Sequence, residues 1–393
     1  ELQQQLTRFA GHEAIQEVLA STLRGPASKE ARLTALQAIA KSALKEMPPT
    51  WATGLADTLA ASDSELRREA VSAARAVPIP KSGFVDLNCA LMRLARDAQS
   101  PSEVRLEAMA AIPGGLTAVE PELFDLLRAS VEPAQPVTVR GNAAVVLAKA
   151  KLTLPQLSNL IDSVSAAGPL ELNTLLGAFA NTGDESLGHD LVRALRESKG
   201  LLSLRSDVLQ QSLSKFPMSV RRESERLLAS LDVDPSKQRA HLDRLLTELK
   251  SGDIRRGQAV FNSTKAACSA CHTIGYLGGK SGPDLTRIGQ IRNERDLLES
   301  LIYPSASFVR SYEPVVVVTQ SGDVHNGVVR EDASSEIVLN TGPRTEVRVT
   351  KAEIKEMRPG TVSVMPAGLE QQFSRGELAD LLAFLKGTRW GAQ

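Results

Sequence analysis

The sequence contains little cysteine, few aromatic residues, no excess charge of either sign and no long apolar run. Three cysteines in 393 residues are too few for a disulfide framework. Lysine plus arginine equals aspartate plus glutamate at 46 each, so the formal net charge is zero. No general electrostatic attraction to nucleic acid or to an anionic membrane is therefore expected. No run of about 18 apolar residues occurs, which argues against a transmembrane segment.

The length and the first residues indicate how the chain is organised. A chain of 393 residues is expected to form at least two domains. Its first twenty residues are polar and helix-like, without the charged-then-apolar layout of a signal peptide. We therefore expect a cytoplasmic protein, a mature form, or part of a longer protein.

Residues 1 to about 235 contain an internal repeat. The pattern R-x-x-A recurs at Arg32, Arg67, Arg105 and Arg140, at spacings of 35, 38 and 35 residues. Each copy follows a short polar turn and opens a helix of small and apolar residues. A period in this range, with two helices per unit, predicts an α-solenoid that resembles HEAT repeats. An irregular helical bundle is the alternative. The arginines are expected to serve packing or helix-end contacts.

The composition changes after about residue 250. A stripe of leucines at helical spacing predicts a linker helix over residues 236–251. Gly252 suits the end of that helix, and Asp253 suits the N-cap of the next one. We therefore predict three parts, namely a helical repeat domain (1–235), the linker helix (236–251) and a C-terminal domain (252–393).

A β-rich block at about residues 312–350 interrupts the C-terminal domain. The β-branched run at 312–320 predicts one strand, and residues 324–330, 336–340 and 345–350 predict three more. Helical patterning returns at Ser374, which forms a capping-box pattern with Glu377. The whole chain is therefore predicted to be mainly α, with a small β-rich insertion.

Two of the three cysteines lie in the pentapeptide CSACH at residues 268–272. This is C-x-x-C-H, the signature of c-type haem attachment. The thiols of Cys268 and Cys271 can add to both vinyl groups of one porphyrin, which holds His272 beneath the iron as an axial ligand. A dithiol redox pair would call for a flanking βαβ pattern, and a zinc site for a second Cys/His pair. The sequence shows neither, and the remaining cysteine is Cys89.

The order of motifs in the C-terminal domain resembles class I cytochrome c. Five features follow one another along the chain: a short helix, C-x-x-C-H, GPDL at residues 282–285, Met365-Pro366 and a capped terminal helix. The resemblance implies that Met365 is the sixth ligand of the haem iron, since cytochromes c use His and Met. It also implies that the carbonyl of Pro283 orients the His272 ring.

The β-rich insertion departs from an ordinary cytochrome c. With it, the segment from Gly252 to about Lys386 resembles the haem-binding domain often found in Planctomycetes and Verrucomicrobia. The shared features are Gly252-Asp253, Gly257, the C-x-x-C-H motif, GPDLT at 282–286, Pro304-Ser305, Tyr312, MPAGL at 365–369 and LLAFL at 381–385. In that family the domain commonly follows HEAT-like repeats, often after a β-propeller that resembles soluble sugar dehydrogenases. The sequence contains no propeller pattern.

Two other residues are alternative sixth ligands. Met357 lies eight residues before Met365, and a methionine in such a position more often fills a core. His325 lies in a predicted hairpin strand, where a histidine is usually solvated. Cys89 is expected to be a small buried hydrophobe.

These observations together predict an electron-transfer module with one covalently attached haem c. The expected partner is a redox protein or a fused dehydrogenase, docked on the helical repeats. A haem-based sensor, or a catalytic haem with a labile sixth ligand, is the alternative, and a scaffold with a structural haem is a third reading. The module is not expected to be an enzyme by itself. Haem attachment takes place outside the cytoplasm, so we expect a periplasmic protein whose signal sequence or upstream region is not present in this chain.

Overall fold

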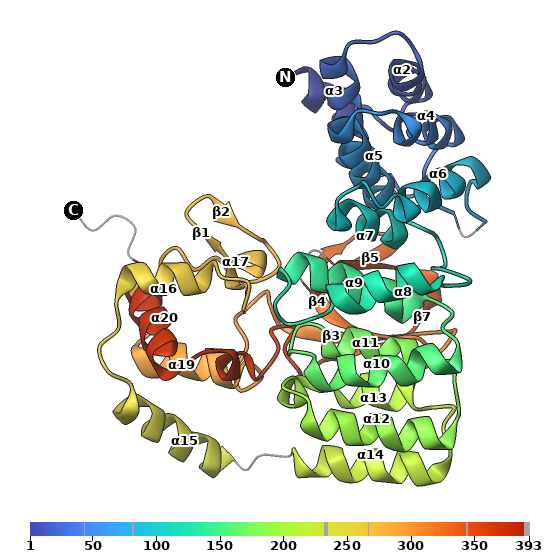
Figure 1. Ribbon diagram of the computed structural model, residues 1–393. Coiled ribbons are helices and arrows are strands. Elements are labelled where there is room, and N and C mark those ends of the chain that lie inside the picture. The colour runs from blue at the N-terminus through green and yellow to red at the C-terminus, as the bar shows by residue number, and fades with distance from the viewer. Residues whose placement is uncertain (43, 81, 232–234, 266, 343–344, 389–393) are drawn as a thin grey trace. The chain divides into compact units, whose positions relative to one another are not determined.

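The structure is a computed structural model that describes residues 1–42, 44–80, 82–231, 235–265, 267–342 and 345–388. The described chain is mainly helical and contains a small antiparallel sheet region (Figure 1), which confirms the predicted mainly α class. It divides into two compact units, Glu1–Glu132 with Thr138–Leu160, and Pro133–Val137 with Ile161–Gln393. No helix in the described part of the chain combines the length and the apolar character needed to cross a bilayer.

Helices in two layers make up most of the first unit. They are α1 (Leu2–Arg8), α2 (Glu13–Arg24), α3 (Lys29–Ala40), α4 (Pro49–Ala60), α5 (Ser64–Ala76), α6 (Val85–Arg96), α7 (Ser102–Ala110), α8 (Pro121–Ser130) and, from the unit boundary onward, α9 (Val137–Lys149). Helices α2, α4 and α6 pack on one another, and α3, α5 and α7 do the same. A core of leucine and alanine, with Trp51 fully buried, joins the layers.

Two of the four repeat arginines contact the end of the preceding helix. Arg32, near the start of α3, donates to the carbonyl of Gly25 at the end of α2 (2.8 Å). Arg105, on α7, donates through Nε to the carbonyl of Ala95 in the last turn of α6 (2.8 Å). A cation is favourable at these positions because the last carbonyls of a helix lack partners within the helix. Both contacts agree with the helix-end role expected for these arginines.

On helix α6, the position of Cys89 differs from the prediction made from the sequence. Cys89 is exposed, so its expected burial is wrong. The buried face of α6 includes Leu87, Leu91 and Leu94, which follow the helical spacing of i, i+4 and i+7. Cys89 lies between two members of this stripe, and the helical period therefore turns it toward solvent.

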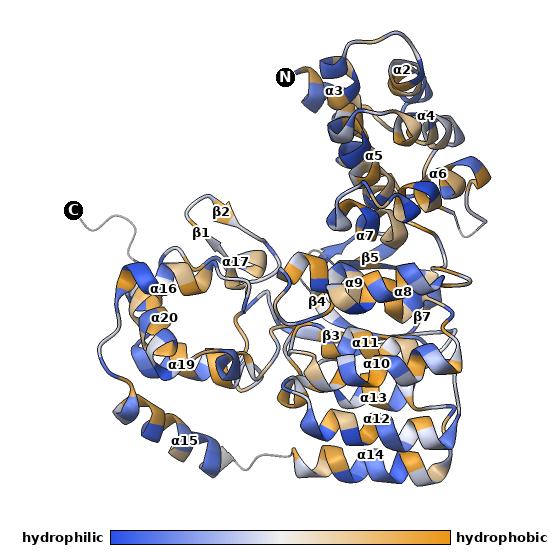
Figure 2. Cartoon of the chain, viewed as in Figure 1, coloured by the Kyte–Doolittle hydropathy of each residue, from blue (hydrophilic) through white to orange (hydrophobic). Residues whose placement is uncertain are grey.

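The second unit begins with a further series of helices. They are the rest of α10 (Leu154–Ala166), which crosses the unit boundary, and α11 (Leu172–Leu175), α12 (Glu185–Glu197), α13 (Ser206–Ser212), α14 (Met218–Ser230) and α15 (Pro235–Glu248). Helix α12 carries hydrophobic and hydrophilic residues in alternating bands along its ribbon (Figure 2), and buries Leu187, Leu191 and Leu195 on one face. The predicted linker helix is present as α15, and its role as a domain boundary stays a prediction.

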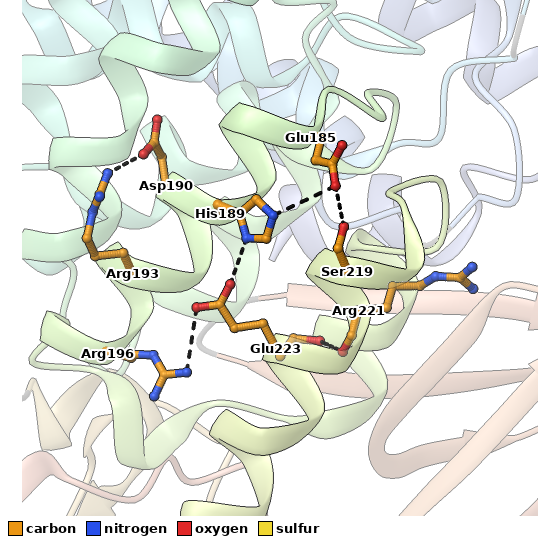
Figure 3. Close-up of polar contacts among 9 residues, drawn as sticks. Glu185, His189, Asp190, Arg193, Arg196, Ser219, Arg221 and Glu223 are labelled. Carbon is orange, nitrogen blue, oxygen red and sulfur yellow. Dashed lines mark hydrogen bonds and ion pairs between the residues drawn. The ribbon is translucent and has the colours of Figure 1, made fainter.

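Polar side chains link the exposed sides of α12 and α14. His189 Nδ1 lies 2.7 Å from Glu223 Oε2, and the same carboxylate lies 3.7 Å from Arg196 (Figure 3). Exposed pairs of this kind contribute about 0–1 kcal/mol because water screens them. The apolar faces, rather than this network, therefore account for the packing of α12 on α14.

The C-terminal part of the second unit is built on three crossing helices. Its helices are α16 (Ile254–Phe261), α17 (Cys268–Cys271), α18 (Ile288–Ile291), α19 (Glu294–Ile302) and α20 (Arg375–Gly387). Helices α16 and α19 both pack on α20 (Figure 1). Asp253 caps α16, and Ser374 with Glu377 forms the capping box of α20, as the sequence predicts.

The crossing of α16 and α20 depends on glycine at position 257. A Cβ atom at Gly257 would lie 1.9 Å from the carbonyl oxygen of Asp380, which a real contact cannot reach. We expect Gly257→Ala to lower the free energy of unfolding by about 1–3 kcal/mol, because the helices must move apart. Gly376→Ala, whose nearest atom would lie 4.0 Å away, is the matched control on α20 itself. Equal thermal stability of the two variants would contradict this reading.

A five-stranded antiparallel sheet lies between α19 and α20 in the sequence. Its strands are β3 (Pro314–Thr319), β4 (Val324–Asp332), β5 (Glu336–Gly342), β6 (Thr345–Thr350) and β7 (Ile354–Pro359), in the order β6-β5-β4-β3-β7. The first four agree with the predicted strands. The fifth, β7, was not predicted, and it carries the sheet to residue 359, beyond the predicted end near 350. It is an exposed edge strand without apolar alternation, so its pattern carried no strand signal.

Candidate functional site

An apolar cavity of about 210 Å³ lies in the second unit. Cys268, Cys271, His272, Pro283 and Met365, which are the residues predicted for the site, all line it. The first four precede the five-stranded sheet in the sequence, and Met365 follows it. The fold therefore brings all the predicted site residues to one cavity.

Leucines of two helices form part of the cavity wall. Leu297 and Leu301 come from α19, and Leu381 and Leu385 come from α20. All four belong to the same hydrophobic core as Phe261 of α16. The α19 leucines were not predicted to belong to the site, although their i, i+4 spacing already indicated a buried helix face. These four side chains make this part of the cavity wall apolar.

The two thiols lie on one turn of helix. Cys268 and Cys271 are three residues apart on α17, a spacing that places both side chains on the same side of the helix. The preceding residue, Ala267, has φ 44° and ψ 49°, in the left-handed region that is unfavourable for residues with a Cβ. Such strain costs about 1–3 kcal/mol and concentrates at functional sites. The turn into the C-x-x-C-H motif is thus held in place by its surroundings.

Both thiols are free and lie in apolar surroundings. Burial raises the pKa of Cys268 to about 12 and the pKa of Cys271 to about 11. A reactive dithiol requires the opposite shift, because the thiolate is the nucleophile. The direction of both shifts therefore argues against the alternative of a dithiol redox pair.

His272 is oriented by the residues that follow it. Its Nδ1 lies 2.9 Å from the carbonyl oxygen of Pro283. Burial lowers the pKa of His272, with the Pro283 carbonyl acting in the opposite direction, so the imidazole is neutral near pH 7. Nδ1–H then donates to Pro283, and the lone pair of Nε2 remains for a metal. A Cβ at Gly282 would lie 2.6 Å from His272 Cε1, so only glycine lets the backbone pack on the ring this closely.

Met365 lines the cavity, and the two rival ligands do not. Met365 is partly buried and packs against the core formed by α16, α19 and α20. Met357 lies on β7 with 44% of its surface exposed. His325 lies on β4, where it pairs with Val317. Neither Met357 nor His325 is among the described residues that line the cavity.

The donor set of the cavity fits a covalently attached haem. Two thiols one turn apart match the two vinyl groups of a porphyrin. A neutral imidazole with a fixed tautomer and a thioether supply the axial nitrogen and sulfur of a His/Met site. The apolar wall of the cavity suits a flat and largely apolar group.

A buried carboxyl group lies close to Met365 in the sequence. Glu370 belongs to the 3-10 helix η4 (Leu369–Gln372), and no described residue hydrogen-bonds its Oε2. Burial raises the pKa of Glu370 to about 6, and the backbone N–H groups of Glu370 and Gly368, together with Arg375, act in the opposite direction. This residue was not predicted from the sequence, because nothing local indicates that its side chain is buried.

Replacing this glutamate is expected to stabilise the protein at neutral pH. A folded pKa above the ordinary 4.5 means that folding disfavours the ionised form, so stability falls as the pH rises from about 4.5 to 6. We expect Glu370→Gln to raise the free energy of unfolding by about 1–2 kcal/mol at pH 7, and by little below pH 4.5. Glu356→Gln, at an exposed position on β7, is the control. A Glu370→Gln effect that does not change with pH would contradict the assignment.

Comparison with known proteins does not assign the chain to a family. No family model matches the chain, and no curated protein matches its sequence. Its function is therefore inferred from the cavity and the residues around it.

Proposed function

We propose that this chain is a c-type cytochrome that transfers single electrons. One haem is attached through thioether bonds to Cys268 and Cys271, with His272 and Met365 as the axial ligands. The observation that carries the proposal is that two thiols, an imidazole and a thioether from distant parts of the sequence line one apolar cavity. A haem in this position supplies a one-electron ferric/ferrous couple.

The protein side chains set the properties of that couple. Pro283 accepts a hydrogen bond from His272, which fixes the ring orientation and strengthens the imidazole as a ligand. The thioether of Met365 raises the reduction potential. If His272 and Met365 both held the iron, no position would remain open for a substrate or a gas. This arrangement favours an electron carrier over a sensor or a catalytic haem.

The surrounding fold supports a class I cytochrome c-like domain with a β-sheet insertion. The capped helices α16 and α20 cross in close contact, and the ring centroids of Phe261 and Phe384 are 5.5 Å apart. The five-stranded sheet is inserted between α19 and Met365. We propose that this domain belongs with the haem-binding domains of Planctomycetes and Verrucomicrobia.

We further propose that the N-terminal helices form a HEAT-like solenoid that docks a partner. Two layers of helices, and arginines that bond preceding helix ends, support a repeat architecture. The electron donor in this proposal is a fused or separate dehydrogenase. Covalent haem attachment then places the protein in the periplasm.

The mass and the spectrum of the intact protein test the proposal. The full chain is exported in a host that attaches haem, and its mass is measured together with its pyridine haemochrome spectrum. We expect one haem per chain, retained after denaturation and extraction with acid acetone. A chain that leaves the same host without haem, or whose haem extracts freely, would overturn the proposal.

A further inference from the structure

A short stretch of chain, residues 360–365, connects the end of β7 to Met365, and we call it the Met365 segment. Its middle is held by the sheet, because Asn326 on β4 donates through Nδ2 to the carbonyl of Val362 (3.1 Å). Its first residue is held as well, since the N–H of Gly360 donates to the carbonyl of Pro314 on β3 (2.8 Å). The segment is thus tied to two neighbouring strands before it reaches the cavity.

The end of the Met365 segment is held by a residue outside the sheet. The hydroxyl of Ser305 accepts a hydrogen bond from the N–H of Ser363 (3.0 Å). The hydroxyl of Ser363 in turn accepts from the N–H of Met365 (3.1 Å). Ser305 follows α19, the helix that supplies Leu297 and Leu301 to the cavity wall. The backbone of Met365 is therefore connected through two hydroxyl groups to the chain that leaves this wall.

Asn326 is an unusual residue for its position. Its side chain is 4% exposed, and its Oδ1 has no hydrogen-bond partner among the described residues. A buried amide with an unpaired oxygen is unfavourable. An apolar side chain would therefore suit the position better if it only had to pack within the sheet. A Cβ at Gly360 would lie 2.9 Å from this oxygen, which shows how closely the Met365 segment passes over Asn326. The evident role of the amide is thus its hydrogen bond to the carbonyl of Val362.

We propose that Asn326 and Ser305 are positioning residues that hold Met365 against the haem, and that the sheet insertion serves as the anchor of the Met365 segment. This inference rests on the proposed function, because it takes Met365 to be an axial ligand. A ligand on a fixed segment loses little conformational freedom when it binds. A ligand on a loosened segment competes less well with an external ligand for the same position.

Imidazole binding to the ferric full-length protein measures this competition. We expect Asn326→Leu, which keeps the branching and the number of side-chain heavy atoms and removes the donor, to strengthen imidazole binding on the order of fivefold, as the loss of one hydrogen bond implies. Ser305→Ala is expected to act in the same direction, and Ser305→Thr, which retains a hydroxyl, to restore the wild-type value. Ser305 is exposed, so its substitution leaves the core intact.

Asn340→Leu is the matched control. Asn340 is a second buried asparagine of the same sheet, and its Oδ1 accepts from the N–H of Gly342 within its own strand (3.2 Å). We expect this variant to lose stability without a change in imidazole affinity. An increase equal to that of Asn326→Leu would mean general loosening of the sheet and would overturn the inference.

The wild-type spectrum separates this inference from the proposed function. A weak charge-transfer band at the red end of the visible range marks sulfur ligation in the ferric protein, and its absence from the wild type would overturn both. If the band is present and neither Asn326→Leu nor Ser305→Ala alters imidazole binding, the positioning role alone is wrong.

Discussion

Replacing Cys268 and Cys271 together by alanine is expected to abolish covalent haem attachment. Both thiols line the cavity and neither is in a disulfide, so each is available to form a thioether bond. Without them, any haem in the cavity is held by axial ligands and apolar contact alone. Acid acetone should then extract all haem from the double variant and none from the wild type, as measured by absorbance of the two phases.

Cys89 provides the matched control for this experiment. It is the third cysteine of the chain and is exposed on α6. Cys89→Ala should retain covalent haem at the wild-type level, while each single variant of the motif should retain one thioether bond. Retention of haem by the double variant after extraction would show that attachment takes place elsewhere.

Met365→Ala is expected to convert the ferric haem from low spin to high spin and to lower its reduction potential. The side chain lines the cavity, and Pro366 restricts the backbone of Met365 to an extended conformation that suits a projecting ligand. Removal of the thioether admits water or leaves the position open. The potential falls because thioether ligation raises it in His/Met sites. The absorption spectrum and a redox titration measure the two effects.

Met357→Ala and His325→Ala are the controls, because both residues lie on the sheet and away from the cavity lining. Neither change should alter the spectrum or the potential. A spectral change in Met357→Ala, with none in Met365→Ala, would reverse the assignment. If none of the three variants changes the spectrum, an external ligand fills the position and the sensor hypothesis gains support.

The sequence by itself predicted features whose cause is local. The thiols of Cys268 and Cys271 and the imidazole of His272 are neighbours along the chain, so their chemistry can be recognised without a fold. Asp253 and Ser374 cap their helices as expected, since a cap involves the next few residues only. The mainly α class and four of the five strands of the larger sheet follow from short-range periodicity in the same way.

The tertiary structure decided what depends on contacts between residues distant in the sequence. It brings Met365 rather than Met357 to the cavity, because the strand β7 carries Met357 to an exposed edge of the sheet. It buries Asn326 and the Oε2 atom of Glu370, and neither polar side chain gives a local sign of this. Hydrophobic periodicity identifies the buried face of an element, and it does not specify which distant element covers that face. The cavity and the anchoring of Met365 therefore emerge only when the helices and the sheet pack together.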